Sequence, residues 1–581
     1  MPSLGRLIGR GLAVYGALSC ASAAVTESNT TDSIKVTYKE PGICETTPGV
    51  KSYSGYVTLP STPRQPYAQK VFFWFFEARD SPGEAPLSIW LQGGPGAPSI
   101  DQALEVNSPC VVQPDSNSTV PNPWSWNNHV NLLYIDQPVQ AGFSYDEATP
   151  GLVDMITGAI AVGGRSSGSS NYTVREGVFA SQDATEAPVT TASAVEVLWE
   201  FTQAWMQEFQ QYRRDKISVW AQSYGGHYAP ALANLIHTRS TAEKKSANGV
   251  TRRGCQEDGY LDIDVDSVDI INGIIDFDIQ GRRRRLGVDS AYANYTRPGG
   301  CKEQIDACRA LTPNGYRDQD GSDGAVTQAC GAAFEYCWTN VYAAYDALGS
   351  DLMPMSFPTS YSAGYLTKKW VLEALGAEVD YTQSSTPDGT GFMMTGDFVY
   401  GGFLEDIESL LDDGVKVALI HGDRDFRCNW VAGEAVSLAA EYRESSAFRA
   451  AGYEKISTNE SYVGGMVRQK GKFSFSRVFQ AGHQVSSYQP ETAYQIFMRT
   501  VFAQDVATGT VSRADSPDYE SQGPASVFDV KNELPSQPDP VCYVLQAPLQ
   551  LSCTPEQLEA LRGGTAVVED DVVVRPAAVG P

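Results

Sequence analysis

The sequence has few histidines, few positive charges and, after its first residues, no long apolar run. Lysine and arginine total 43 against 69 aspartate and glutamate residues, so the formal net charge of the 581 residues is −26 at pH 7. Nucleic acids and anionic membrane surfaces are also negative, so this balance argues against either as a partner. The missing apolar run argues against a membrane-spanning helix beyond the N-terminus. With five histidines in all, few side chains are candidates for a catalytic base.

The N-terminal stretch is the one apolar segment of note. Arg6 and Arg10 precede it, and the small residues 21–23 (Ala-Ser-Ala) follow it. This order is typical of a secretory signal peptide, so we expect residues 1–23 to be removed and the mature chain to be secreted. The remaining length allows three or four domains, but one large α/β domain with insertions is the simpler interpretation.

The cysteines fit an oxidising compartment. Cys20 lies in the predicted signal peptide, and the other ten are an even set, which favours disulfides in a secreted chain. Four of the ten have symmetric spacing, which suggests the nested pairs Cys301–Cys337 and Cys308–Cys330. No C-x-x-C pair or nearby histidine accompanies these four, so we predict no metal site and no cofactor. The pairing of the others stays open: Cys44, Cys110, Cys255, Cys428, Cys542 and Cys553.

Two kinds of surface motif accompany the cysteines. Sequons for N-glycosylation stand at Asn29, Asn117, Asn171, Asn294 and Asn459. The run Arg282–Arg285 is basic within an acidic protein, and it is either a solvated surface or a site of proteolytic processing.

The stretch ISVWAQSYGGHYAP, residues 217–230, organises the rest of the chain. A β-branched, apolar run stops at Ala221 and helical character resumes at Tyr228, which puts Ser223 at a sharp strand-to-helix turn. Ala221 and Gly225 stand where the pattern G-x-S-x-G has its glycines, as a nucleophile elbow requires. An ordinary structural turn is the alternative for this motif taken alone.

Apolar runs on both sides of this motif predict a mixed, mostly parallel sheet. The first two form an antiparallel pair, and the others alternate with helices. The predicted strands are 53–59, 71–77, 87–91, 130–135, 217–221, 415–420 and 473–479, and the predicted helices are 192–211 and 490–504. Strand 87–91 leads into Gln92-Gly-Gly-Pro-Gly96, whose glycines leave backbone N–H groups bare for an oxyanion site, although a plain tight turn has the same composition.

A serine nucleophile needs an imidazole base, and the imidazole needs a carboxylate. Of the five histidines only His483 follows the last predicted strand, and the strand before it ends in a loop that contains Asp423 and Asp425. The chain order Ser223, Asp425, His483 is that of α/β hydrolases. We therefore predict an α/β-hydrolase fold, in which residues 24–280 and 398–504 form the core.

Between these core segments, residues 281–397 lose the strand pattern and hold the four spaced cysteines. We expect them to form a disulfide-stapled insertion that caps the site. Residues 505–581 are expected to be an irregular C-terminal extension closed by Cys542 and Cys553.

Five blocks, in order, resemble those of the serine carboxypeptidase family, particularly its fungal branch: WLQGGPGAPS, IDQPVQAGFSY, AQSYGGHYAP, GDRDFRCNW and AGHQVSSYQP. The resemblance implies a secreted or vacuolar acid exopeptidase that acts on peptides with a free C-terminus. It puts Ser223, Asp425 and His483 at the triad positions. Asp425 is selected over Asp423 because the family's acid lies three positions before its cysteine. The resemblance also gives the oxyanion hole to the N–H groups of Gly94 and Tyr224.

The sequence departs from the family at the residues that hold the substrate carboxylate. Trp90 and Gly93 are retained, but the family's asparagine is Gln92 and the glutamate before the nucleophile is Gln222. Counting without gaps puts Val106 at the second glutamate's position, with Glu105 beside it. Other departures are Ala97 and Ser486, and the family implies a free thiol at Cys428 beside the substrate pocket.

Three hypotheses follow from these matches and departures. The first is a serine carboxypeptidase that works through an acyl-enzyme. The second is an esterase or acyltransferase that keeps the triad but recognises a different substrate, as the altered carboxylate residues would allow. The third, a non-enzymatic binding protein, does not explain why the triad and both oxyanion turns are retained. No pattern in the sequence indicates an oligomeric state.

Overall fold

The computed structural model describes residues 34–62, 65–105, 107–163, 172–246, 260–282, 289–343, 360–533 and 541–576. The predicted signal peptide, Asn29, Asn171, Val106, Cys255 and most of the run Arg282–Arg285 lie outside these residues. Within the described part of the chain, no helix combines the length and the apolarity needed to cross a bilayer.

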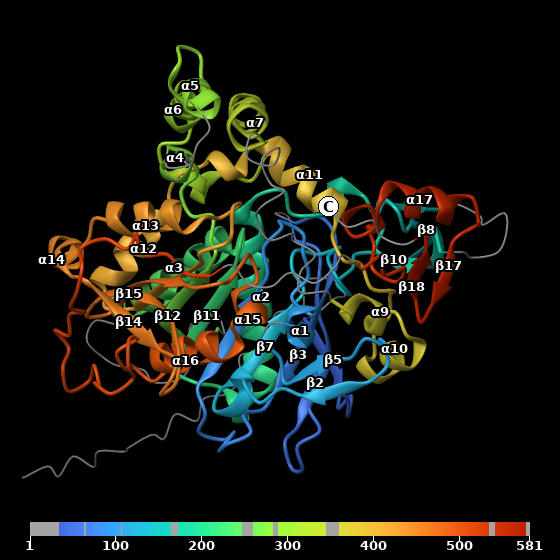
Figure 1. Cartoon of the computed structure of the whole chain (residues 1–581), viewed down its shortest axis with the longest axis horizontal. Helices are drawn as coiled ribbons and strands as arrows, with labels where there is room; N and C mark the ends of the chain where they lie inside the picture. Colours follow the sequence, from blue (N-terminus) through green and yellow to red (C-terminus); the bar gives the residue numbers. More distant parts are fainter. Residues whose placement is uncertain are drawn as a thin grey trace, which may run out of the picture. The chain divides into compact units, whose positions relative to one another are not determined.

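An 11-stranded sheet forms the centre of the fold (Figure 1). Its middle strands run parallel in the order β7-β4-β11-β12-β13-β16, and antiparallel strands extend it at both edges. This confirms the mixed sheet of an α/β hydrolase. In spatial order the strands are β1 (Lys35–Lys39), β2 (Ser52–Leu59), β3 (Gln69–Phe76), β7 (Asn131–Ile135), β4 (Leu87–Leu91), β11 (Lys216–Gln222), β12 (Asp264–Ile271), β13 (Lys416–Gly422), β16 (Phe473–Val478), β15 (Val463–Lys470) and β14 (Tyr453–Ser457).

The central strands are buried on both faces because helices cover each side. Val219 of β11 belongs to the apolar core that includes α2 (Thr191–Glu208) and α3 (Gly225–Ser246). Trp220, the next residue, points to the opposite core, where its ring centroid lies 4.8 Å from that of Phe497 of α16 (Pro490–Val501). Successive side chains of a strand alternate between faces, so an unbroken apolar run is what a strand between two helical layers requires.

The predicted insertion is helical in the described residues. Helix α4 (Phe277–Arg282) leads into it and α12 (Phe403–Asp412) follows it. The insertion contains α5 (Asp289–Thr296), α6 (Cys301–Leu311), α7 (Gly324–Cys337), α9 (Ser362–Leu366), α10 (Lys369–Leu375) and α11 (Thr386–Thr395). Helices α6 and α7 lie side by side (Figure 1) and are joined by Cys301–Cys337 and Cys308–Cys330. These are the nested pairs that the spacing predicts.

The sequence patterns missed four strands of the large sheet, β1, β12, β14 and β15, and two smaller regions. Strands β8 (Thr149–Asp154), β9 (Ile160–Val162) and β10 (Val174–Phe179) form a separate three-stranded sheet. The hairpin of β5 (Cys110–Val112) and β6 (Thr119–Pro121) is anchored by the disulfide Cys44–Cys110. Both regions consist of short, half-exposed strands, whose sequences lack the long apolar runs of the central sheet.

The C-terminal region is more regular than we expected. Residues 541–576, here called the C-terminal module, contain α17 (Pro555–Arg562) and the hairpin of β17 (Val567–Glu569) and β18 (Val572–Arg575). The expectation of an irregular extension is therefore wrong for these residues, although Cys542 and Cys553 do form a disulfide. The module packs on the β8–β10 sheet through a shared apolar cluster that includes Val153, Phe179 and Leu549 (Figure 1).

Candidate active site

Ser223 occupies the turn between β11 and α3. Its φ is 62°, in the left-handed region that few non-glycine residues adopt. Its N–H donates to Ile271 O at 3.0 Å, and its carbonyl accepts from Ile274 N at 2.9 Å. Within residues 217–230 Ser223 alone is not buried. A strained turn fixed by neighbouring backbone and carrying one accessible hydroxyl has the geometry of a nucleophile elbow.

Small residues are required around this turn by direct contact. A Cβ on Gly225 would lie 2.6 Å from Ala221 Cβ and 3.1 Å from Leu91 O. A Cβ on Gly93 would lie 2.4 Å from Tyr224 N and 2.9 Å from Ser223 Cβ. The glycine turn after β4 therefore lies directly against the elbow, and neither glycine can be replaced without moving backbone.

Asp425 and His483 meet at the ends of the next strands of the sheet. Asp425 follows β13, His483 follows β16, and Asp425 Oδ2 lies 2.7 Å from His483 Nδ1. The other oxygen, Oδ1, accepts hydrogen bonds from the N–H groups of Arg427 at 2.9 Å and Cys428 at 3.2 Å. Burial by itself raises the pKa of Asp425, but His483 and these donors outweigh it and the pKa is lowered. The carboxylate is thus held ionised against the imidazole.

The neighbouring acid, Asp423, has other partners. Its Oδ1 accepts a hydrogen bond from Gln480 N at 2.9 Å, and its Oδ2 lies 3.4 Å from the Arg477 guanidinium. Asp423 therefore bonds to the strand that precedes the histidine loop, and Asp425 bonds to the histidine itself.

The other histidines have local roles. His227 is fully buried and stacks on Phe403 with centroids 3.9 Å apart, and burial lowers its pKa. His421 is also buried, and burial lowers its pKa to about 4. His237 contacts Asp264 at 2.8 Å, and His129 contacts Asp80 at 3.4 Å. Among the five, only His483 has a hydrogen bond to Asp425 in the described part of the chain.

Two side chains hold the backbone of the histidine loop. Gln222, beside the nucleophile, donates from Nε2 to His483 O at 3.0 Å. Asn272, at the end of β12, donates to the same carbonyl at 2.6 Å and accepts from Gly422 N at 2.9 Å. The sequence analysis missed Asn272, although a polar Asn-Gly after a buried strand was a signal that it could have used. Through these contacts, residues next to Ser223 and Asp425 fix the position of His483.

The predicted oxyanion donors lie on the two facing turns. Gly94 has a φ of 106°, and Tyr224 follows Ser223. In the described residues no backbone carbonyl accepts from Gly94 N or Tyr224 N. An oxyanion hole requires backbone N–H groups that are not already bonded to a carbonyl.

Asp136, a buried residue not predicted to have a role, fixes the glycine turn. Its carboxylate accepts from Ser99 N and Ile100 N at 2.9 Å and from Phe143 N at 3.0 Å. Burial raises its pKa to about 7. Gly142 is required beside it, because a Cβ there would lie 2.1 Å from Asp136 Oδ2. The carboxylate joins the segment after β4 to the segment after β7.

The residues predicted to bind the substrate carboxylate lie near this turn and are nearly all buried. Trp90 packs against Trp126 with centroids 5.6 Å apart. In the described part of the chain, Trp90 Nε1, Gln92 Oε1 and Gln222 Oε1 are buried and have no hydrogen-bond partner. Cys428 is buried. Its Sγ lies within 4.8 Å of a carboxylate oxygen of Asp425 and of a ring nitrogen of His483.

Glu105 ends the short helix α1 (Gln102–Glu105). Its Oε1 accepts hydrogen bonds from the hydroxyl groups of Ser360 and Ser362. Its backbone carbonyl accepts from Ser487 Oγ at 3.3 Å, four residues after the catalytic histidine candidate. Burial, and then the nearby charge of Asp101, raises the pKa of Glu105 to about 8. Burial likewise raises the pKa of Asp101 to about 6.

The sequons in the described residues differ in exposure. Asn117 and Asn459 are exposed, whereas Asn294 is half-buried and donates from Nδ2 to Asn340 O at 3.0 Å. Because Asn117 and Asn459 are the more exposed, they are the better acceptors of the three.

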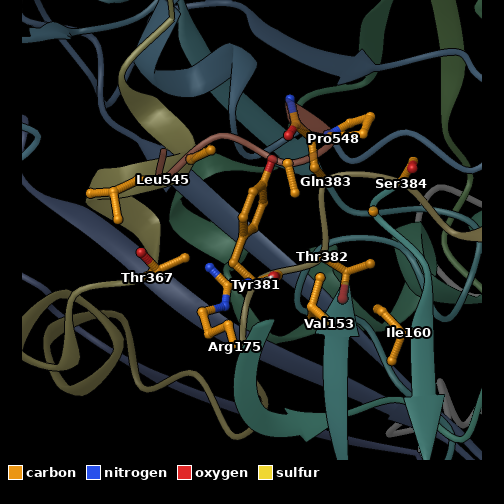
Figure 2. A pocket seen from close by; sticks show the side chains of 13 residues that line it. Val153, Ile160, Arg175, Thr367, Tyr381, Thr382, Gln383, Ser384, Leu545 and Pro548 are labelled. Atoms are coloured by element: carbon orange, nitrogen blue, oxygen red, sulfur yellow. Dashed lines mark hydrogen bonds between the residues drawn. The ribbon is translucent and has the colours of Figure 1, made fainter. Parts of the chain in front are cut away.

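A small cavity lies between the C-terminal module and the segment 381–384 (Figure 2). Its volume is about 30 Å³, and its lining includes Arg175, Thr367, Tyr381, Leu545 and Pro548.

Comparisons with known proteins agree with this geometry. A family model described as serine carboxypeptidase matches residues 41–503. Carboxypeptidase S1 homolog A of Arthroderma otae is 39% identical over 603 residues, which cover 98% of this chain and 91% of that protein. Carboxypeptidase Y homolog of Arthroderma benhamiae is 37% identical, with 95% and 91% covered. Carboxypeptidase S1 of Penicillium janthinellum is 29% identical, with 80% and 98% covered.

A solved structure gives the same fold. Kex1(delta)p, a prohormone-processing carboxypeptidase from Saccharomyces cerevisiae, matches with a TM-score of 0.53 and 19% identity over 78% of this chain and 91% of that one. At this identity the likeness bears on the fold alone, and the fold is the α/β-hydrolase fold expected from the order of the strands and helices.

Proposed function

Because this chain belongs to the serine carboxypeptidase family, we propose that Ser223 forms the acyl-enzyme through which C-terminal amino acids are released from peptides. Family membership makes the chain a serine-type carboxypeptidase, a hydrolase that acts on peptides. The roles of individual residues are our proposal. The observation that carries them is the 2.7 Å contact of His483 with Asp425, in a loop that Gln222 joins to the elbow.

In the proposed reaction, Ser223 Oγ attacks the carbonyl carbon of the last peptide bond. His483 Nε2 takes the hydroxyl proton and then gives it to the leaving amine, so that the released amino acid departs and the acyl group stays on Ser223. Asp425 accepts from Nδ1, which fixes the tautomer and stabilises the imidazolium. Water, activated by the same histidine, then hydrolyses the ester.

Negative charge develops on the carbonyl oxygen during both steps. Gly94 N–H and Tyr224 N–H are the proposed donors to it, and the contact between Gly93 and Tyr224 holds the two turns together. Because Asp136 bonds to the backbone that follows the glycine turn, the donors are positioned before the substrate arrives.

The substrate carboxylate is proposed to meet Trp90, Gln92, Gly93, Gln222 and Glu105, with Cys428 at the side of the pocket. Ser360 and Ser362 occupy Glu105 Oε1 and leave Oε2 for the substrate. While Glu105 is protonated, Oε2 can donate to the anion. Gln222 uses one of its two amide hydrogens on His483 O, and the other remains for the substrate.

A second candidate reaction, ester hydrolysis or acyl transfer, has one observation in its favour. Both Gln92 and Gln222 are neutral amides where the family has an asparagine and a glutamate, and each has a buried oxygen with no described partner.

Secretion or vacuolar delivery through residues 1–23 is likewise proposed from the sequence.

Replacing Ser223 tests the mechanism most directly. The Ser223→Ala variant should fold normally and lose hydrolysis by about 10⁴-fold or more, because only oxyanion binding and positioning remain. Labelling with a fluorophosphonate should disappear in the same variant. Near-normal turnover by Ser223→Ala would refute the assignment.

A panel of substrates separates the two candidate reactions. We expect N-blocked dipeptides with a free C-terminus to be cleaved with a higher kcat/KM than the same dipeptides as C-terminal amides, because the free carboxylate is the group recognised. A preference for amides or esters would favour the second candidate.

A further inference from the structure

The strongest unassigned feature is the junction between the C-terminal module and the two serines that bind Glu105. The module lies beyond residues 41–503, which the family model matches. The alignment with the Arthroderma otae relative nevertheless covers 98% of this chain, so it includes at least part of the module. The C-terminal module therefore lies outside the region that the family model matches but packs close to it.

Tyr543 is the residue of the module at this junction. It is fully buried and lies next to Cys542, which the disulfide with Cys553 holds in place. Its hydroxyl group hydrogen-bonds to Ser116 Oγ, in the turn between β5 and β6. Ser116 Oγ in turn donates to Tyr361 O at 3.0 Å, and the Tyr543 and Tyr361 rings meet edge to face with centroids 5.3 Å apart.

Tyr361 stands between the two serines that bind Glu105. It is the residue that precedes α9, with Ser360 before it and Ser362 as the first residue of the helix. Gly364, one turn later, is required by the same contact, since a Cβ there would lie 2.5 Å from the Tyr543 hydroxyl. The start of α9 is therefore placed by Tyr543 and Ser116 from one side, and it presents Ser360 and Ser362 to Glu105.

A second contact of the module reaches the same region. Leu545 and Pro548 line the small cavity together with Thr367 and Tyr381 (Figure 2). Burial, and after it the charge of Asp101, raises the pKa of Tyr381, so the tyrosine lies near the acid beside Glu105. The module thus borders both the α9 segment and Tyr381.

We propose that Tyr543 is a positioning residue, and that through Ser116 and the start of α9 the C-terminal module sets Glu105 in the orientation that recognises the substrate carboxylate. The proposal rests on the role of Glu105 given under the proposed function. A recognition group is effective only when its supporting contacts fix its rotamer, so loosening this junction weakens binding without touching the chemistry.

The test compares Tyr543→Phe, which removes one hydroxyl, with the wild type on two substrates. One is an N-blocked dipeptide with a free carboxylate, and the other is the N-blocked amino-acid ethyl ester that shares its acyl part. KM for the dipeptide should rise about three- to tenfold, as expected for the loss of one buried hydrogen bond. Its kcat and both constants for the ester should not change, because the ester has no terminal carboxylate.

Tyr212→Phe is the matched control. Tyr212 is also buried, and its hydroxyl donates to Glu77 Oε1 at 2.5 Å. Tyr212 precedes β11, whereas Ser223 follows that strand. The Tyr212→Phe variant should leave KM and kcat unchanged for both substrates. If Tyr543→Phe does not fold, Ser116→Ala interrupts the same chain of contacts and should give the same selective rise in KM.

A double variant separates this proposal from the one on which it rests. If Glu105→Ala, which removes the carboxyl group, raises KM for the dipeptide, adding Tyr543→Phe should have no further effect, because both act through one carboxyl group. Additive effects, or equal losses on dipeptide and ester, would overturn the positioning role of Tyr543. A Glu105→Ala variant with unchanged KM would overturn the role of Glu105, and with it this proposal, whereas Ser223 is tested separately by its own variant.

Discussion

The proposed reacting groups and Glu105, one of the residues proposed to bind the substrate carboxylate, are supported by different parts of the molecule. Ser223, Asp425 and His483 follow strands β11, β13 and β16, which lie within one parallel run of the sheet. Glu105 depends instead on Ser360 and Ser362, about 255 residues away in the sequence, and on a module beyond the catalytic region. Neighbouring parallel strands end at the same edge, so the reacting groups are brought together by the sheet itself.

This difference indicates which groups of the site can move without disturbing the core. Moving a reacting group requires moving a strand that is buried on both faces, which would disrupt the close packing of the core. Moving Glu105 requires only a shift of α9 or of the C-terminal module. We therefore expect catalysis to be robust and carboxylate recognition to be adjustable, and the following predictions test this contrast in order of decreasing effect.

The largest effect is expected for His483. His483→Ala removes the base, so kcat should fall about 10⁴-fold or more. His227→Ala removes a buried ring that stacks on Phe403, so it should lower stability through a cavity while kcat stays within about tenfold. Steady-state kinetics and thermal unfolding of both variants measure the two effects. Equal losses of kcat at the two histidines would contradict the assignment of the base.

Removing disulfides should show how far the less regular regions depend on them. The double variant Cys301→Ser with Cys337→Ser opens a loop of 36 residues, and we expect it to lose about 2–4 kcal/mol of unfolding free energy. Cys542→Ser with Cys553→Ser opens a loop of 11 residues and should lose roughly 1 kcal/mol less, because shorter loops gain less from closure.

Urea denaturation of both double variants makes this comparison. For the second of them, KM for a dipeptide should also rise, since the disulfide holds Tyr543. If the shorter loop proved more important for stability than the longer one, loop length would not be the controlling factor.

The smallest effect is the pH dependence of KM. Glu105 has a pKa raised to about 8, so below that pH it is neutral and can donate to the substrate carboxylate, and above it the ionised form repels the same anion. KM for a free-acid dipeptide should therefore be flat between about pH 5 and pH 7 and rise above about pH 8. Glu105→Gln cannot ionise, and its KM should stay flat throughout.

The Gln222→Glu variant adds a second test of pH dependence, because it introduces an ionisable group beside Ser223. An ionised glutamate at position 222 would lose the donor to His483 O and face that carbonyl with a negative charge, so kcat and KM should both worsen as it ionises. An effect on KM alone would mean that Gln222 meets only the substrate. No effect on either constant would mean that the contact with His483 does not matter for catalysis.

The sequence by itself determined the central strands other than β12, the elbow, the glycine turn and the nested disulfides. Each depends on a pattern that is local or nearly so. Strands buried on both faces require continuous apolar runs, and Ser223 at a positive φ requires small neighbours. The choice of Asp425 over Asp423 came from the resemblance to the family. The family resemblance rests on the same short blocks.

Only the tertiary structure decided the supporting contacts. Asn272 and Asp136 are polar residues at strand ends, which the sequence can mark, but only the folded chain shows which loops of the site they hold. The packing of the C-terminal module on α9 joins segments that are far apart in the chain, and its short strands carry too few residues for a hydrophobic pattern. Such contacts depend on the positions of distant segments in the folded chain, and no local sequence pattern encodes them.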